Sequence, residues 1–209
     1  MATVSMKRVA LIASEKGGVG KSVFTRTLVD WLRGRNQRVA AYDADGSIGA
    51  TVRVLGLRSA NGTLVLDQDP SVGVGFYQGR AEGERNKLLD AIASKEALYV
   101  HDLAGGLLTD VMKIVDDGSN LNGLLDAFES HGYRLSIFHL ISPDVGSAQS
   151  VNRWLEVTGA RADHIAVVNR KHGTPPADFP FWYGFKDAKG KEKGGKARSK
   201  LLESGGVEI

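Results

Sequence analysis

The 209-residue sequence contains no cysteine. This absence excludes disulfides, iron–sulfur clusters and zinc sites built on thiolates. It fits a reducing compartment, and we predict a cytoplasmic protein. No apolar run approaches the roughly 20 residues that a membrane-spanning helix needs. The N-terminal stretch MATVSMKRVALIA is short and has no small-residue cleavage site, so we expect no signal peptide.

The five histidines are scattered along the chain and show neither H-x-x-H nor H-E-x-x-H spacing. We therefore expect no metal site that protein side chains hold by themselves. No serine lies in a G-x-S-x-G stretch, the motif that exposes the nucleophile of α/β-hydrolases. Zinc and serine hydrolase chemistry are thus both disfavoured.

Positive charge is concentrated near the C-terminal end. Residues 186–200 (KDAKGKEKGGKARSK) hold seven basic and two acidic side chains, although the whole chain has a net charge of only +3. Such a segment is either a solvated flexible loop or a contact for a polyanion. No amphipathic membrane helix is visible beside it, so DNA is the polyanion that we predict.

Short apolar runs alternate with segments of helical periodicity. The runs at 9–13, 38–42, 71–77, 97–101, 134–140 and 164–168 predict strands, and the segments at 21–33, 84–94, 121–131 and 147–158 predict helices. Continuous apolar strands are typical of a parallel sheet that is covered on both faces. The pattern predicts a single α/β domain with a mostly parallel central sheet and helices on both faces.

Residues 13–22 (ASEKGGVGKS) lie between the first predicted strand and the first predicted helix. They nearly match the phosphate-binding pattern G-x-x-x-x-G-K-[ST], but Glu15 stands in place of the first glycine and Lys16 follows it. Glycines let backbone N–H groups converge on an anion, and the following helix adds its positive N-terminal end. We expect Lys21 to neutralise the β- and γ-phosphate oxygens of a nucleotide, and the Ser22 hydroxyl to bind Mg²⁺. The residues expected around the β-phosphate are Gly17, Gly18, Val19, Gly20 and Lys21.

The stretch KGGVGKS resembles the deviant Walker A motif of the ParA/MinD ATPases, a family in the SIMIBI class of P-loop proteins. The resemblance implies that Lys16 is the signature lysine, which reaches across a dimer interface to the nucleotide of the partner subunit. It also implies a homodimer with ATP sandwiched between the subunits, and a single-domain P-loop fold. Because there is no cysteine, the nitrogenase-reductase branch of this class is excluded.

Two further stretches contain aspartates at positions where the ParA/MinD family also has them. Residues 42–51 (YDADGSIGAT) follow the second strand, and the resemblance implies that Asp45 orients the attacking water while Asp43 supports Mg²⁺ through a water. Gly46 and Ser47 replace the usual proline and glutamine, which leaves the rate of hydrolysis open. In the second stretch, LYVHDLAGG, Asp102 would hold Mg²⁺ through a water.

Residues 167–170 (VVNR) resemble the family's strand that ends near the adenine. Asn169 carries both a donor and an acceptor and can read a base edge, although an asparagine after a strand is also a common turn residue. The residues predicted to bind the nucleotide are Gly17, Gly18, Val19, Gly20, Lys21, Ser22, Val23, Asn169 and Arg170. The predicted catalytic residues are Lys16, Lys21 and Asp45, and the predicted Mg²⁺ residues are Ser22, Asp43 and Asp102.

The resemblance covers residues 7 to about 170. We predict a nucleotide-binding domain over 1–183 and a basic Lys/Gly-rich tail over 184–209. Residues 200–209 (KLLESGGVEI) predict a helix, a glycine turn and the start of a strand, as in a truncated domain end or a natural end with a minimal last strand.

The resemblance favours a slow, Mg²⁺-dependent ATPase that works as a dimer switch. Its cargo would be plasmid DNA or a partition or conjugation complex, engaged through a partner protein of that type. One alternative is a nucleotide-binding scaffold that barely hydrolyses ATP. Another is an ATP-dependent ligase of the dethiobiotin or cobyrinate synthetase type, although Lys16 and the lack of an amidotransferase domain disfavour it.

Overall fold

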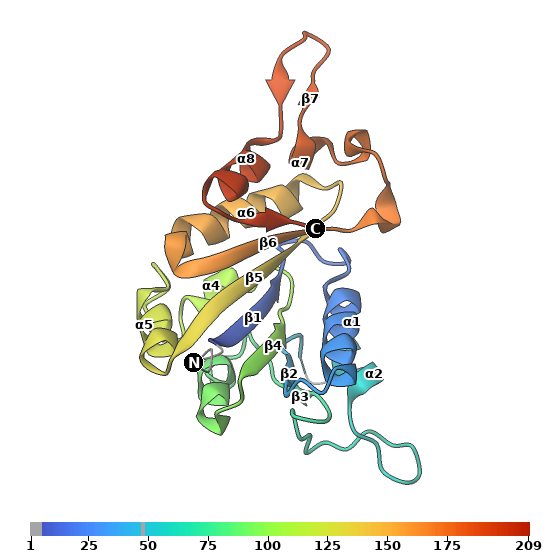
Figure 1. Ribbon diagram of the computed structural model, residues 1–209, viewed down its shortest axis with the longest axis vertical. Helices are drawn as coiled ribbons and strands as arrows, with labels where there is room; N and C mark the ends of the chain where they lie inside the picture. The colour runs from blue at the N-terminus through green and yellow to red at the C-terminus, as the bar shows by residue number, and fades with distance from the viewer. Residues whose placement is uncertain (1–5, 47–48) are drawn as a thin grey trace, which may run out of the picture.

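The computed structural model describes residues 6–46 and 49–209, and its centre is a parallel β-sheet (Figure 1). The strands lie in the order β3-β2-β4-β1-β5-β6-β9. Their bounds are Lys7–Ala13 (β1), Ala40–Asp43 (β2), Gly75–Phe76 (β3), Leu98–Asp102 (β4), Tyr133–Ile141 (β5), Ala162–Val168 (β6) and Val207–Glu208 (β9). The chain leaves β1 toward β2 on one side and later returns to β5 on the other. Ligands of open α/β sheets bind at such a reversal, beyond the carboxyl ends of the strands.

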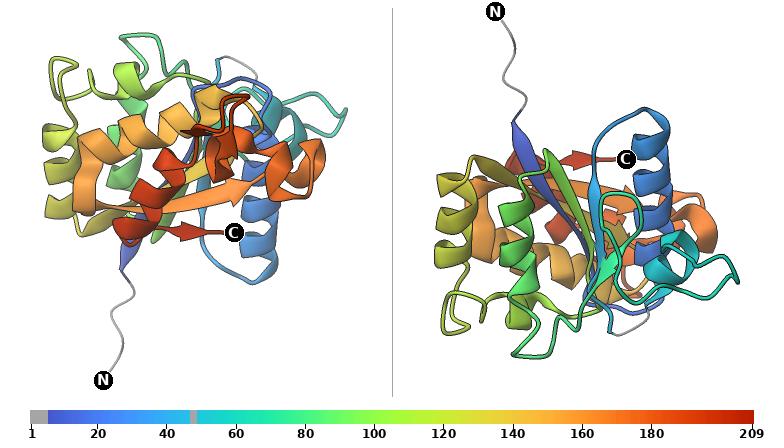
Figure 2. Two further views of the ribbon diagram at one scale, coloured as in Figure 1. Left: turned by 90° about the horizontal axis from the view of Figure 1, so that it is seen from above. Right: turned by 90° about the horizontal axis from the view of Figure 1, so that it is seen from below.

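Helices cover both faces of the sheet, as predicted (Figure 2). Their bounds are Lys21–Gly34 (α1), Ala50–Leu55 (α2), Lys87–Asp90 (α3), Leu108–Val111 (α4), Asn122–Ser130 (α5), Val145–Thr158 (α6), Pro180–Tyr183 (α7) and Lys196–Glu203 (α8). Short 3₁₀ turns lie at Ala91–Ser94 (η1), Gly159–Arg161 (η2), Arg170–His172 (η3) and Pro176–Asp178 (η4). No helix among the described residues combines the length and apolar character needed to cross a bilayer.

Alternate residues of β1 enter two separate cores, because successive side chains of a strand point to opposite faces. Val9 and Leu11 pack with residues of α4, α5 and α6. Ala10 and Ile12 pack on the other face, with residues of α1 and α2. All four side chains are buried, which explains why this strand has an uninterrupted apolar sequence.

The strand predicted over 71–77 is shorter in the structure, where only Gly75–Phe76 (β3) pairs with β2. The preceding carbonyls are occupied by the Arg33 guanidinium of α1. It donates to the backbone oxygens of Pro70 (2.9 Å), Val72 (2.9 Å) and Gly73 (2.8 Å). The Pro70 oxygen also accepts from the Ala41 N–H of β2 at 2.9 Å, whereas the Val72 and Gly73 oxygens are satisfied by the guanidinium.

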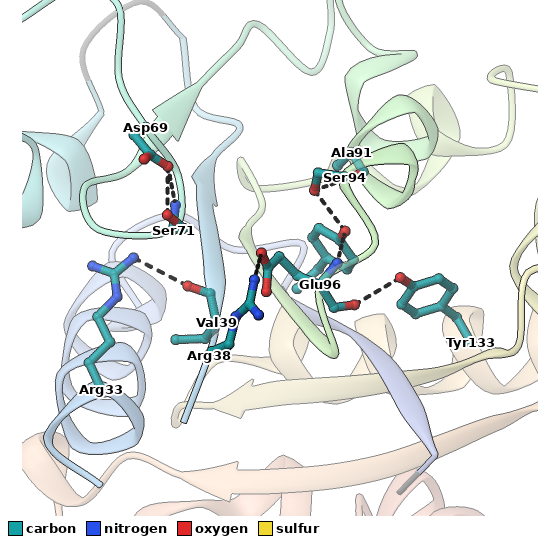
Figure 3. Close-up of polar contacts among 10 residues, drawn as sticks. Arg33, Arg38, Val39, Asp69, Ser71, Ala91, Ser94, Glu96 and Tyr133 are labelled. Atoms are coloured by element: carbon teal, nitrogen blue, oxygen red, sulfur yellow. Dashed lines mark hydrogen bonds and ion pairs between the residues drawn. The ribbon is translucent and has the colours of Figure 1, made fainter. Parts of the chain in front are cut away.

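Polar contacts tie together the amino ends of the strands, away from the predicted site (Figure 3). Arg38, before β2, donates to the Glu96 carboxylate at 2.8 Å. The Tyr133 hydroxyl donates to the Glu96 backbone oxygen, also at 2.8 Å. These contacts connect the starts of β2, β4 and β5.

The C-terminal segment first forms a β-hairpin and then adds the last strand to the central sheet. Strands β7 (Phe185–Lys186) and β8 (Glu192–Lys193) pair antiparallel and project from the top of the molecule in Figure 1. Helix α8, a glycine turn and β9 follow, and β9 extends the sheet beside β6. The helix, turn and strand predicted near the end are confirmed, although α8 begins earlier than expected, at Lys196. The domain division after residue 183 stays a prediction.

Candidate nucleotide-binding site

The loop between β1 and α1 has a backbone that only glycine adopts readily. Gly18 has φ 73° and Gly20 has φ 98°, both in the left-handed region. A Cβ on Gly20 would also lie 2.6 Å from the side-chain nitrogen of Asn169. The loop leads directly into α1, whose N-terminal end carries unpaired N–H groups and partial positive charge. This strand–loop–helix arrangement suits an anion.

Lys21 is the first residue of α1 and is only 8% exposed. Its ammonium donates to the backbone oxygen of Lys16 at 3.4 Å. Burial lowers the pKa of Lys21, while the charges of Asp102 and Asp45 act in the opposite direction. In the part of the chain that the structure describes, this is the one hydrogen bond of the ammonium, so it can bind an anion beside these acids.

Asp102 lies at the carboxyl end of β4 and is 1% exposed. The Thr51 hydroxyl donates to its carboxylate at 2.6 Å. Burial raises the pKa of Asp102 to about 6, although hydrogen bonds from Thr51 and Ser22 lower it. Hydroxyl and carboxylate oxygens are the ligands that Mg²⁺ prefers, so this group of side chains fits the metal. Thr51 is the last residue of the 42–51 stretch, and the sequence predicted no role for it.

Asp43 organises the segment that follows β2. Its buried carboxylate accepts backbone N–H bonds from Asp45 (3.1 Å), Thr51 (2.9 Å) and Val52 (3.2 Å). Burial raises the pKa of Asp43, and these bonds lower it. A Cβ on Gly49 would lie 2.1 Å from the same carboxylate, so the close approach requires glycine. Asp43 thereby shapes the chain that carries Asp45, and its predicted support of Mg²⁺ stays a prediction.

A cavity of about 600 Å³ opens beside these residues. Most of the residues predicted to bind nucleotide line it, namely Gly17, Gly18, Gly20, Lys21, Ser22, Val23, Asn169 and Arg170. The exposed Asp45 also lines it, whereas Lys16, Asp43 and Asp102 do not. Val19 lines an adjoining cavity of about 460 Å³ with Ser142, Pro143 and Asp144. Ser47, one of the two replaced family positions, lies outside the described residues.

Asn169 joins the end of β6 to the glycine loop. Its amide nitrogen donates to the Val19 backbone oxygen at 2.8 Å, and its amide oxygen accepts from the Lys171 N–H at 3.1 Å. Both polar groups of the side chain therefore hold protein backbone. The predicted contact of Asn169 with a base edge stays a prediction.

Lys16 lies at the surface, outside the cavity. Its ammonium is 3.8 Å from the carboxylate of Asp144, at the start of α6, and both side chains are about half exposed. The neighbouring Glu15 pairs with Arg153 of α6 at 3.0 Å. The sequence contained no local signal for these partners, because they are more than 100 residues away.

Comparison with known proteins shows a family and similar folds. The family described as the CobQ/CobB/MinD/ParA nucleotide binding domain matches residues 10–174. The fold is similar to the cell division ATPase MinD of Pyrococcus furiosus, with a TM-score of 0.52 and 19% identity over 83% of this chain and 78% of that one.

Two other solved structures are similar at the level of the fold. The septum site-determining protein MinD of Pyrococcus horikoshii, complexed with Mg-ADP, has a TM-score of 0.51 and 16% identity over 84% of this chain and 76% of that one. The MinC:MinD cell division protein complex of Aquifex aeolicus contains a chain with a TM-score of 0.51 and 17% identity, covering 97% of this chain and 81% of that one. No curated protein sequence matches this chain.

Proposed function

Because the chain belongs to the CobQ/CobB/MinD/ParA nucleotide-binding domain family, we propose that it is an ATP-binding and ATP-hydrolysing dimer switch of the ParA/MinD type. The observation that carries the proposal is the buried Lys21 ammonium, placed between a glycine loop and two acids at the wall of a large cavity. A buried cation at a helix N-terminus matches the charge of a triphosphate.

The remaining residues take complementary roles. Ser22 and Asp102 would hold Mg²⁺. Asp43 would contact the metal through a water, and its hydrogen bonds also hold the segment after β2 in place. The bound metal would neutralise and orient the phosphates. Asp45, exposed in the cavity wall, would orient the attacking water, since a carboxylate accepts the hydrogens of that water.

Lys16 is the residue that we propose to contact the nucleotide of a second subunit. Its own-chain contact with Asp144 is long and half exposed, and such pairs contribute only about 0–1 kcal/mol. The lysine can therefore exchange Asp144 for the phosphates of a nucleotide bound to a second subunit. ATP would then hold the homodimer together, and hydrolysis would release it.

The cargo that we propose is plasmid DNA or a partition or conjugation complex, engaged in the cytoplasm through a partner protein. The similar chain of Aquifex aeolicus belongs to a MinC:MinD cell division protein complex, which supports a partner for this chain too. The exposed lysines of the β7–β8 hairpin favour an additional non-specific contact with DNA.

The family description also includes CobQ and CobB, so a small-molecule ligase is the second candidate. ATP turnover that depends on a small metabolite would favour it. A scaffold with negligible turnover is the third candidate, because Gly46 and Ser47 depart from the common family sequence.

The proposal is tested by titrating the protein with ATP and Mg²⁺ in a calorimeter. Lys21→Ala should weaken ATP binding on the order of 100-fold, because the triphosphate loses charge-assisted bonds of about 1.5–3 kcal/mol. Lys87→Ala, an exposed lysine outside the cavity, is the control and should bind as the wild type does. If Lys21→Ala binds ATP within a few-fold of wild type, the glycine loop does not bind nucleotide as proposed.

A further inference from the structure

The peptide group between Gly105 and Gly106, just after β4, is held at both of its polar atoms. Its N–H, on Gly106, donates to the Ser14 backbone oxygen at 3.1 Å. Its carbonyl, on Gly105, accepts from the guanidinium of Arg80. Gly106 has φ 72°, so the bend after this peptide requires glycine. Ser14 and Arg80 together set how the peptide is oriented.

This peptide lies against the phosphate-binding loop. Gly105 lines the 600 Å³ cavity, and a Cβ on it would lie 3.4 Å from the Gly17 nitrogen and 3.5 Å from the Lys16 carbonyl carbon. The two backbones therefore lie next to each other, and the bond from the Gly106 N–H to the Ser14 oxygen joins them directly, so the orientation of the peptide is coupled to the start of the loop.

Arg80 comes from a segment that also contacts the chain around Asp45. Gln78 forms an antiparallel bridge with Asp45, and the Gly79 N–H donates to the Ala44 backbone oxygen at 3.2 Å. The second guanidinium nitrogen of Arg80 lies 3.8 Å from the Asp110 carboxylate in α4. Residues 78–80 therefore contact the Asp45 segment through their backbone, and the loop after β4 and α4 through the Arg80 side chain.

We propose that Arg80 is a positioning residue for ATP hydrolysis, which fixes the Gly105–Gly106 peptide against the phosphate-binding loop and couples it to the segment that carries Asp45. The inference rests on the proposed ATPase function. The Arg80 side chain is 61% exposed, and its ion pair with Asp110 is long, so it contributes little to folding. Its hydrogen bond to Gly105 instead acts on a peptide group in the cavity wall.

The expected effect is on turnover more than on binding. The amides of the glycine loop and Lys21 remain in Arg80→Ala, so KM for ATP should stay within about twofold of wild type. The kcat should fall about 10-fold, because the groups around the attacking water lose their fixed geometry. In the nucleotide-free protein, backbone amides of residues 103–108 should exchange hydrogen faster, since the Gly105–Gly106 peptide is freed.

Three further variants make the test specific. Arg80→Lys keeps a donor for the Gly105 carbonyl and should recover most of the kcat. Asp110→Asn leaves the Gly105 bond in place and should change kcat less than Arg80→Ala does. Arg38→Ala removes an arginine that pairs with Glu96 at the amino ends of the strands, away from the cavity. It should leave both kcat and exchange at 103–108 unchanged.

The inference is overturned if Arg80→Ala keeps wild-type kcat and wild-type exchange over 103–108. It is also overturned if Arg80→Ala and Arg80→Lys lose the same activity and both lower Tm by more than about 5 °C, since Arg80 would then only stabilise the fold. Wild-type protein that binds no ATP would instead refute the proposed function itself.

Discussion

At the scale of single residues, the site depends on side chains that hold backbone. Asp43 fixes the segment before α2, and Asn169 bridges the glycine loop and the end of β6. Both were predicted to act on the ligand or its metal. In the structure their polar atoms contact protein, so their first effect is to shape the cavity.

Asn169→Ala tests this reading of the site. The variant loses two hydrogen bonds to backbone, each contributing about 0.5–1.5 kcal/mol, so ATP and GTP affinities should both fall by roughly 10-fold. Fluorescence titration with the two nucleotides measures the ratio. An exposed asparagine outside the cavity, Asn86→Ala, is the control. A loss confined to ATP would instead show that Asn169 reads the base.

At the scale of elements, the β7–β8 hairpin differs from the rest of the fold. It projects from the body (Figure 1), and its strands are exposed. Lysines lie along the hairpin and the start of α8, and only Asp187 and Glu192 oppose them within 186–200. Two-stranded ribbons of this kind can enter the major groove of DNA, and lysines near phosphates release counterions.

Replacing Lys189, Lys191, Lys193 and Lys196 with Gln should therefore weaken DNA binding and flatten its salt dependence. Each lost phosphate contact makes the slope of log K against log salt less negative by about 0.9, so the loss of two to four contacts should change it by about 1.8 to 3.6. Fluorescence anisotropy with a random duplex at several salt concentrations measures it. A control with Arg53, Lys87, Lys95 and Lys113 changed to Gln removes the same charge elsewhere. Equal slopes for the two variants would contradict a hairpin contact.

At the scale of the whole molecule, the proposed switch needs two subunits. Lys16 lies outside its own cavity, and within residues 6–46 and 49–209 its one ion pair is with the half-exposed Asp144. Lys21, by contrast, is buried beside the cavity of its own chain. One lysine can thus bind the nucleotide within the subunit while the other is free to reach a partner.

Sedimentation with a non-hydrolysable ATP analogue separates these roles. Lys16→Ala should retain ATP affinity within about 10-fold but stay monomeric, because the partner's phosphates lose a charge-assisted contact. Asp45→Ala should form dimers as the wild type does, since Lys16, Lys21 and the loop amides proposed to contact the phosphates remain. Its kcat should fall by about 100-fold or more. Nucleotide-independent masses that are equal for all three proteins would refute the ATP sandwich.

The sequence by itself determined those features that depend on neighbours in the chain. The apolar run at 9–13 became β1, because a strand buried on both faces needs apolar side chains at every position. The glycine loop and Lys21 could also be predicted from neighbouring residues, because left-handed backbone needs glycine and the lysine directly follows the loop at the helix N-terminus. The α/β fold class followed from the alternation of such segments.

Only the tertiary structure decided which distant residues meet. Arg33 binds carbonyls about 40 residues away, just before β3, Thr51 reaches Asp102 across 51 residues, and Arg80 reaches Gly105. None of these pairs leaves a periodic trace in the sequence. Thr51 and Arg80 meet their partners because the strand order brings the carboxyl ends of β2, β3 and β4 together, where loops from separate parts of the chain pack. Arg33 meets its partners at the other end of the strands, where the chain enters β2 and β3.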